Sequence, residues 1–421
     1  MQGLFESIAF TAALAITVAA LQMAIGRSLR DAPGLSLASG FAVAIAVSLI
    51  GLAPTSANFA AQPAEWGLCL LAFAAACQLN LKRVFRVSAP AFRLASVGVI
   101  IGLVFWALTA FVVLPQMSFA TAVLIAAALT LNGSSFNTTA LLAAPAPTNV
   151  KKTAQIEGAT TTVIAVPIAL FSVGFAMNSA PNEAALAPLL EQSLSMLSGY
   201  ILGGLLGVVA GGIGKWFFKA SVKDNPESLF TRIDAFGAPA VIALIAAVAV
   251  SPFIGANPII ASLGVGLVWG AEVGNEPKVR RALQGISDKL VPPIAYFGFG
   301  FLVLPLVLEA DLLSMVFAVS AVTILRVAPR SLALAAGGGN KQIPQRTRDF
   351  MAWYGGAPGV TTALFLIMLT GMPMISGLNE VLEVGALCVA LGVLGTQLGS
   401  RPLLNGYIRA SARPNPKRAF A

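Results

Sequence analysis

The segment Trp353-Tyr354-Gly355-Gly356-Ala357-Pro358-Gly359 lies in the middle of an apolar run at residues 347–370. That run is long enough to cross a bilayer as a helix, which takes ~20 apolar residues. Three glycines and a proline within five residues oppose helical hydrogen bonding at this point. The segment therefore predicts a membrane helix that is interrupted near its middle, and a simple kink is the alternative.

A second interruption is predicted in the run at residues 118–144. It contains Asn132, Gly133, Ser134 and Ser135 in succession, followed by another polar group at 137–139. Small polar residues can also serve close helix packing, which is the competing interpretation. Two interrupted helices in corresponding positions of a membrane protein indicate a binding site for a transported solute. We therefore take these four residues, together with Gly355, Gly356, Pro358 and Gly359, as site and helix-break candidates.

The composition of the whole chain supports a membrane protein. Of 421 residues, 57% are hydrophobic and only 10% are charged, and the mean hydropathy is +0.85. A soluble core cannot bury so much apolar surface at this length. The chain has no histidine and three cysteines, which argues against histidine metal sites, Ser-His-Asp triads and a disulfide framework. We expect no metal, no cofactor and no enzymatic activity.

Thirteen apolar runs qualify as membrane spans, so we predict an all-α polytopic protein with about 13 transmembrane helices. The runs are residues 4–25, 35–53, 64–81, 91–114, 118–144, 153–178, 194–217, 235–252, 256–271, 290–308, 312–335, 347–370 and 381–399.

The loops between these runs test the count. Lysine or arginine follows every odd-numbered span, and the loops after the even-numbered spans contain neither. Among 26 basic residues only Arg326 and Arg330, which lie inside the eleventh span, depart from this rule. The positive-inside rule then predicts an outside N-terminus and a cytoplasmic C-terminus. The net charge of +9 is scattered among the loops, so we expect no nucleic-acid partner.

The sixth span carries the third polar group. Glu157 lies near its start, and Thr160, Thr161 and Thr162 follow one turn later. A carboxylate inside a span is costly and indicates a cavity or a charged partner. Threonines can also bond back to their own helix and have no further role.

Several segments in order resemble the monovalent cation–proton antiporter superfamily, the sodium–proton exchangers. They are Trp66 to Arg83, Ile259 to Gly270 and Leu290 to Val303, which resemble the family's third span, the span before its cytoplasmic linker and its Phe-rich span. The resemblance covers nearly the whole chain. It implies an inverted-repeat antiporter fold with two interrupted, crossing helices, a homodimer in a membrane, and alternating access.

The resemblance also implies one transmembrane domain over residues 1–421. Its core bundle would span approximately 91–178 and 312–399, its dimerisation or scaffold spans 1–81 and 194–308, and a basic cytoplasmic tail 400–421. A bacterial inner membrane is the expected location.

The chain departs from the family at the ion site. When the family's glutamate is placed on Glu157, Thr161 and Thr162 stand where the family has an acidic pair or Asn-Asp. Asn132 stands where the family often has aspartate, and Arg326 fits the family's basic residue in the eleventh span. These residues, with Ser134 and Ser135, are the predicted ion-binding or coupling residues.

Three functions remain open. The first is antiport of a monovalent cation, such as Na⁺ or K⁺, against protons, with Glu157 as the remaining titratable group. The second is transport of an anion or a neutral solute without proton exchange, and the third is a membrane sensor or scaffold that does not transport. We also expect Glu157 and Arg326 to pair, because each alone in hydrocarbon costs several kcal/mol.

Overall fold

The computed structural model describes residues 33–49, 60–79, 89–131, 141–142, 144–177, 186–221, 229–273, 277–336 and 344–412. Its regular elements in these ranges are helices: α2 (Pro33–Leu49), α3 (Ala61–Gln78), α4 (Ala89–Ala95), α5 (Val97–Val113), α6 (Phe119–Thr130), α8 (Thr148–Met177), α9 (Leu186–Ser221), α10 (Leu229–Val250), η4 (Ser251–Ile254), α11 (Pro258–Glu272), α12 (Pro277–Glu309), α13 (Leu312–Val322), α14 (Ile324–Ala335), α15 (Gln345–Tyr354), α16 (Val360–Leu369) and α17 (Leu378–Ala412).

The all-helical membrane architecture expected from the sequence is confirmed. Seven described helical segments are long and apolar enough to cross a membrane, and four shorter apolar helices accompany them. In the described residues, every predicted span from 35–53 to 381–399 overlaps one helix or a consecutive pair of helices, and the span 118–144 does so through α6. The first predicted span, 4–25, lies outside the described residues.

Polar side chains fix where several helices begin. The Ser118 hydroxyl accepts a hydrogen bond from the Thr121 amide at the start of α6. The Asn257 side chain accepts from two amides at the start of α11, where Pro258 occupies the first helical position. Asp311 caps α13 through the Ser314 amide. Each cap satisfies amides that have no partner within their own helix.

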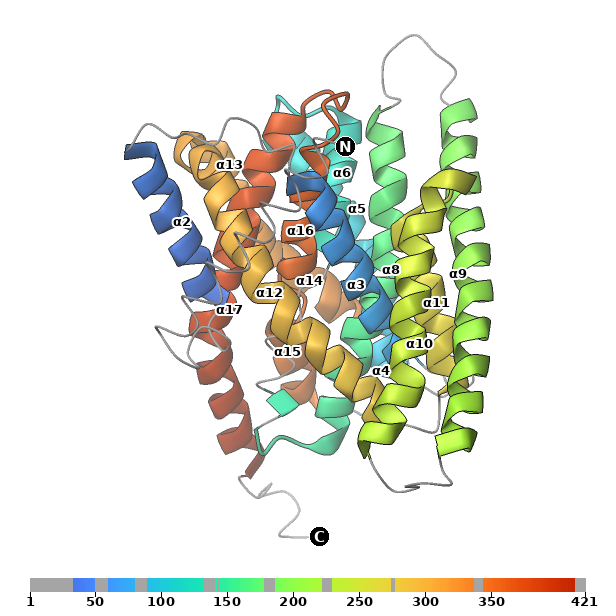
Figure 1. Cartoon of the computed structure of the whole chain (residues 1–421). Helices are drawn as coiled ribbons and strands as arrows, with labels where there is room; N and C mark the ends of the chain where they lie inside the picture. The colour runs from blue at the N-terminus through green and yellow to red at the C-terminus, as the bar shows by residue number, and fades with distance from the viewer. Residues whose placement is uncertain are drawn as a thin grey trace.

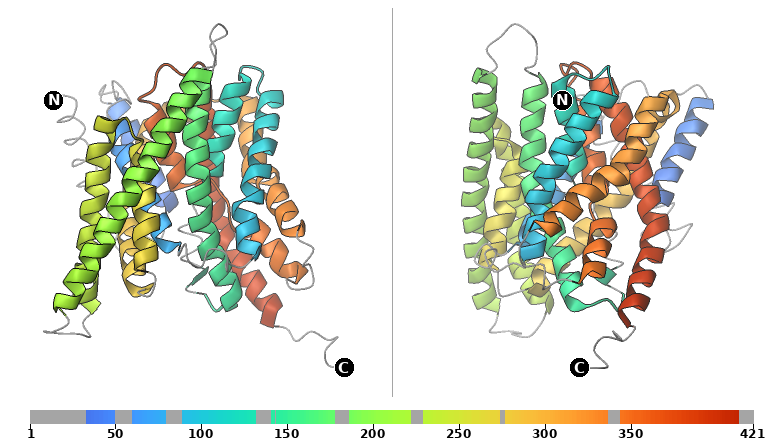
Figure 2. Two further views of the ribbon diagram at one scale, coloured as in Figure 1. Left: turned by 90° about the vertical axis from the view of Figure 1, so that its right-hand side faces the viewer. Right: turned by 180° about the vertical axis from the view of Figure 1, so that it is seen from behind.

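One side of the bundle is held by contacts between backbones. Helices α9, α10 and α11 gather there, opposite α2, α13 and α17 (Figures 1 and 2). A Cβ added at Gly203 of α9 would meet the Ala261 carbonyl oxygen at 2.0 Å, and one at Gly266 of α11 would meet the Phe73 carbonyl oxygen at 2.5 Å. Glycine at these crossings lets α9, α11 and α3 approach more closely than other residues would allow.

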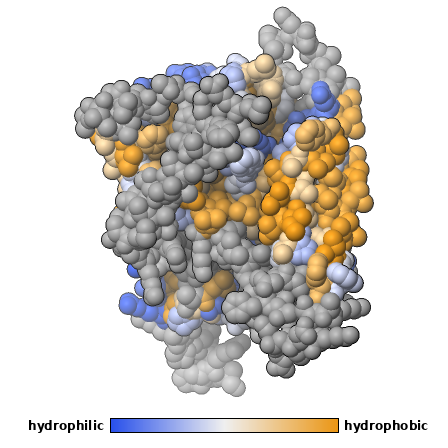
Figure 3. Space-filling view, in the orientation of Figure 1, coloured by the Kyte–Doolittle hydropathy of each residue, from blue (hydrophilic) through white to orange (hydrophobic). Residues whose placement is uncertain are grey.

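The outer surface of this side is apolar. Large side chains of α9 and α10, among them Ile201, Leu205 and Ile242, are exposed. Figure 3 shows apolar surface over the right-hand side of the view, where these helices lie in Figure 1. A soluble protein would bury such a face, whereas in a bilayer it meets lipid.

The run predicted as the twelfth span is two helices. Helix α15 ends at Tyr354, the five residues 355–359 are not helical, and α16 begins at Val360. Gly356 has a φ of +78°, a left-handed conformation that glycine adopts without strain. In the run predicted as the fifth span, α6 ends at Thr130, and the following residues 132–140 lie outside the described part of the chain.

Candidate functional site

Two arginines of α14 hold the end of helix α15. The Arg330 Nε and Nη2 atoms donate to the carbonyl oxygens of Ala352 (3.1 Å) and Met351 (2.8 Å). The Arg326 Nη2 atom donates to the carbonyl oxygen of Trp353 at 3.1 Å. The last carbonyls of a helix have no partner within it and carry partial negative charge, so guanidinium groups satisfy and stabilise them.

Arg330 also forms the charged pair at the centre of the molecule. Its Nη1 atom donates to Glu157 Oε1 of α8 at 2.5 Å. Both residues are buried, with 7% of Arg330 and 5% of Glu157 exposed. The pair connects helices that are 173 residues apart in the chain. A buried carboxylate that lost this partner would be strongly destabilising.

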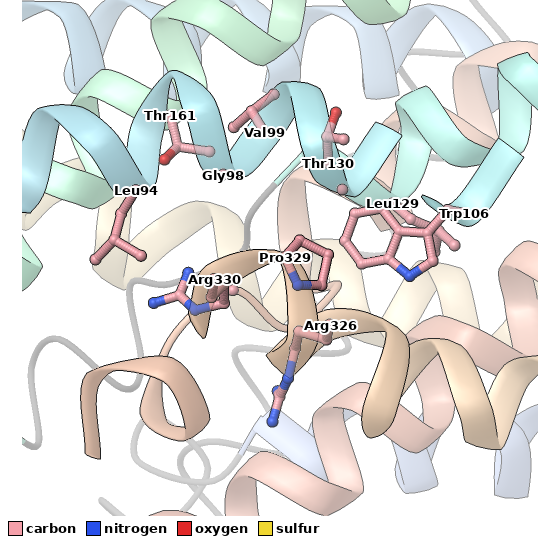
Figure 4. Close-up of a pocket in the computed structure, with 12 residues that line it drawn as sticks. Leu94, Gly98, Val99, Trp106, Leu129, Thr130, Thr161, Arg326, Pro329 and Arg330 are labelled. Carbon is pink, nitrogen blue, oxygen red and sulfur yellow. The ribbon is translucent and has the colours of Figure 1, made fainter. Parts of the chain in front are cut away.

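The predicted pairing of Glu157 with Arg326 is wrong. Glu157 contacts Arg330 instead, and Arg326 makes no ion pair with any described residue. In Figure 4 the two arginines leave α14 in different directions, and the Arg326 guanidinium points away from Thr161 and Trp106. Residues four positions apart lie on the same face of a helix, but only Arg330, the second of these arginines, reaches α8.

The predicted spans contain a signal that favours Arg330. Glu157 lies four residues from the start of the span 153–178 (157 − 153), and Arg330 lies five residues from the end of the span 312–335 (335 − 330). Arg326 lies nine residues from that end (335 − 326). One span begins on the side of the bilayer where the other ends, so matched depth selects Arg330.

The glycines of the interruption make room for Arg330. A Cβ added at Gly355 would lie 2.6 Å from Arg330 Nη2, and one at Gly356 would lie 2.6 Å from Nη1. Neither distance is compatible with a side chain unless the guanidinium moves. These two residues therefore end α15 and also admit the arginine that holds its carbonyls.

The start of α16 is tied to two other helices. The Thr362 hydroxyl donates to the Leu131 carbonyl oxygen, directly after the end of α6, at 2.6 Å. The Pro358 carbonyl oxygen would lie 2.7 Å from a Cβ at Gly392 of α17. Gly359 occupies the N-cap position of α16 without a side-chain cap. The hydrogen bond of Thr362 brings the end of α6 and the start of α16 together, and nothing in the local sequence of Thr362 predicts this contact.

The threonines of α8 are buried beside this centre. The Thr162 hydroxyl donates back to the Gly158 carbonyl oxygen of its own helix at 3.0 Å. Thr161 lines a cavity of about 30 Å³ between α5, α6, α8 and α14, together with Thr130, Trp106 and Arg326 (Figure 4). Such a volume holds one or two water molecules.

Four predicted site residues, Asn132, Gly133, Ser134 and Ser135, lie outside the described residues. In the described ranges, no three side chains among Cys, Asp and Glu come together as a metal site would require. The centre that the structure describes is therefore one carboxylate, two guanidinium groups, hydroxyls and the ends of interrupted helices. Such a set can exchange a proton or a small ion at the carboxylate, and it contains no group arranged for covalent catalysis.

These features define a polytopic helical membrane protein of the secondary-transporter class, with charged residues at an interrupted helix. Residues 12–399 match the sodium/hydrogen exchanger family (transmembrane), and the chain belongs to that family. Its members are transporters and not enzymes.

Solved structures agree with the fold. The structure of the sodium proton antiporter MjNhaP1 from Methanocaldococcus jannaschii at pH 8 has a TM-score of 0.68 and 13% identity, over 96% of this chain and 99% of that one. A map of the same antiporter from electron microscopy gives 0.68 and 13%, over 98% and 100%. No curated protein sequence matches the chain. The expected antiporter-like fold is thereby confirmed.

Proposed function

We propose that this protein is a secondary active transporter that exchanges a monovalent cation for protons by alternating access. The observation that carries the proposal is the buried Glu157–Arg330 pair beside the interruption between α15 and α16. A buried ionisable pair at an interrupted membrane helix is costly unless it serves ion movement or a required contact. Family membership gives the class of ion.

The two predicted units provide the moving parts of this proposal. Helices α3, α9, α10 and α11 share a hydrophobic cluster of their own that includes Phe73, Ala247 and Trp269. Helix α5 packs on α6 and α14, and these three helices also contact α4, α8, α13 and α15. Helix α17 packs on α13, α6 and the interrupted pair, while α8 contacts both α6 and α3. This division supports a core of approximately 91–178 and 312–399 that moves against a scaffold of 1–81 and 194–308.

Glu157 is the proposed site of exchange. Its Oε1 atom accepts the hydrogen bond from Arg330, which leaves Oε2 available for a proton or a cation. A proton and a cation exclude each other at one carboxylate because each neutralises its charge. Arg330 keeps the carboxylate paired while neither is bound, which lowers the cost of an empty site.

Neutral oxygens complete the proposed site. Thr161 and Thr162 lie one turn after Glu157, and Asn132, Ser134 and Ser135 follow the end of α6 in the sequence. Hydroxyl and amide oxygens coordinate alkali cations but release no proton at neutral pH. Proton coupling therefore rests on Glu157, and Arg326 shapes the local charge without touching the carboxylate.

The experiment uses the full chain in proteoliposomes that contain a pH-sensitive dye. An imposed gradient of Na⁺, K⁺ or Li⁺ should move protons through the wild-type protein, and Glu157→Gln should abolish the movement. Glu191→Gln, at an exposed residue of α9, is the matched control. If none of the three cation gradients moves protons through the wild-type protein, the proposal is overturned.

A second variant separates the remaining alternatives. Thr162→Asp places a carboxylate where the family resemblance expects one. If the wild type is inactive and Thr162→Asp exchanges a cation for protons, the fold still transports and lacks only the carboxylate. Continued inactivity would favour an anion, a neutral solute or a sensor without transport.

Assembly and orientation complete the proposal. We propose a homodimer in a bacterial inner membrane, with the N-terminus outside and the C-terminus in the cytoplasm. The support is the family membership and the alternation of basic loops along the sequence.

A further inference from the structure

Helix α16 starts without a side-chain cap from its own N-cap residue. Its N-cap residue is Gly359, which has no side chain, and its first turn contains no acidic residue. The first helical hydrogen bond runs from the Ala363 amide to the Gly359 carbonyl oxygen. The amides of Val360, Thr361 and Thr362 therefore need partners from elsewhere, as the first amides of any helix do.

Tyr296 of α12 supplies one of these partners. Its side chain is 4% exposed, and its hydroxyl is hydrogen-bonded to the backbone of Val360. The Val360 amide donates and the phenolic oxygen accepts, since a backbone N–H can only donate. A residue of another helix thus takes the role that Ser, Asp or Asn usually takes at the N-cap position.

The neighbour of Tyr296 fixes α12 at this level. A Cβ added at Gly40 of α2 would lie 2.2 Å from the Phe297 carbonyl oxygen, and one at Gly300 would lie 2.4 Å from the Leu37 carbonyl oxygen. Helices α2 and α12 are therefore in backbone contact over the turn that follows Tyr296. The phenol extends from a tightly held segment.

Two cavities adjoin the buried contact between α12 and α16. A cavity of about 160 Å³ lies between α3, α12 and α16, lined by Ala295 and Leu302 on one side and Leu364 and Ile367 on the other. A second cavity of about 590 Å³ adjoins Leu302 and Ile367 and continues to the start of α17. Apolar contacts between the two helices are not directional, so the hydrogen bond of Tyr296 adds a directional contact between α12 and the first residue of α16.

We propose that Tyr296 is a positioning residue: it caps α16 from the scaffold and so sets the balance between two positions of the core. This inference rests on the proposed function, because it assigns α12 to the scaffold and α16 to the core. Movement of the core must break the hydrogen bond between Tyr296 and Val360. The bond therefore favours the position described here over the alternative one.

The test removes only the hydroxyl, with Tyr296→Phe in the full-length protein. A single hydrogen bond of ordinary strength should shift the ratio of the two core positions about fivefold. Spin labels at Phe253→Cys on η4 and Asn379→Cys on α17, both exposed, report that ratio as a distance distribution. Hydrogen–deuterium exchange at residues 355–365 should also accelerate about fivefold. Tyr200→Phe on α9 is the matched control and should change neither.

The outcomes separate this inference from the proposed function. Faster exchange at 355–365 together with a shifted distance distribution supports the role of Tyr296. Unchanged exchange at 355–365 in Tyr296→Phe overturns it. If exchange is faster in Tyr296→Phe but the wild type moves no protons with Na⁺, K⁺ or Li⁺, the capping role stands and the proposed function is removed. If exchange accelerates in Tyr296→Phe but the distance distribution does not change, Tyr296 does not set the position of the core.

Discussion

Arg330 uses the whole of its guanidinium group. Three of its nitrogens donate to Glu157, Met351 and Ala352, so one side chain both pairs a carboxylate and ends a helix. A lysine offers a single point charge on a flexible stem and cannot reach these groups together. The residue is therefore fixed by geometry as well as by charge.

Removing both members of the pair should cost less than the two single removals added together. Arg330→Gln leaves Glu157 buried without a cation, at about 3–5 kcal/mol. The double variant Glu157→Gln with Arg330→Gln removes both charges, so its loss should be smaller than the sum of the two single losses. Thermal unfolding of the purified protein in detergent measures all three variants. Additive losses would contradict the coupling.

A methyl group at residue 356 should also disturb Arg330. Gly356→Ala combines a φ of +78° with a Cβ only 2.6 Å from the Arg330 Nη1 atom, so we expect a loss of about 1–3 kcal/mol. Gly212→Ala on α9 is the control, because a Cβ there meets nothing within 4 Å. The melting temperature should fall for the first variant and should hold or rise for the second. Equal melting temperatures would count against the crowding argument.

At this scale the sequence predicted residue types better than partners. The glycines and the proline at 355–359 predict an interruption from local backbone preferences alone, and in the structure α15 ends at Tyr354 and α16 begins at Val360. Arg326 was given the partner that belongs to Arg330, since that choice depends on how far α14 and α8 are shifted along each other. Thr362 and Tyr296 carry no distinctive pattern, because their hydrogen bonds join segments that are distant in the sequence.

The helices themselves were predictable from composition. Continuous apolar runs are a local property, and each predicted span beyond the first overlaps helix in the described residues. The breaks within two of those spans were harder to predict. One run divides into α13 and α14 at Thr323, and another into α4 and α5 at Ser96, although neither point has glycine or proline. At both points a hydroxyl donates to the carbonyl oxygen four residues earlier, Ser96 to Phe92 and Thr323 to Val319, and such back-bonding bends a helix.

Helix α13 offers a test that depends on pH. The pKa of Asp311 is lowered, first by the hydrogen bond from the Ser314 side chain and then by that from the Ser314 amide. A carboxyl with a lowered pKa stabilises the fold above its unfolded pKa and loses that contribution as pH falls through the folded value. The melting temperature of wild type should therefore decline on acidification more than that of Asp311→Asn. Identical pH profiles would exclude the cap as the cause.

The whole molecule gives a prediction about sidedness. The loops predict that residue 183 is outside and residue 413 inside. In intact cells, an impermeant thiol reagent should label Glu183→Cys and should label Arg413→Cys only after permeabilisation. The native cysteines Cys69, Cys77 and Cys388 are buried, so they should add little background. The reverse pattern of labelling would overturn the orientation.

The unequal number of charges at the centre has a consequence for membrane voltage. With Glu157 ionised, the two arginines leave one net positive charge among these three buried side chains. If the core moves them together, each elementary charge that crosses the whole field contributes about 2.3 kcal/mol per 100 mV. An inside-negative potential then draws the unloaded core toward the cytoplasm, and protonation of Glu157 strengthens that pull by adding a second positive charge. The turnover of the carrier would thus be electrically biased, and each replacement of Arg326 by a neutral residue would remove part of that bias.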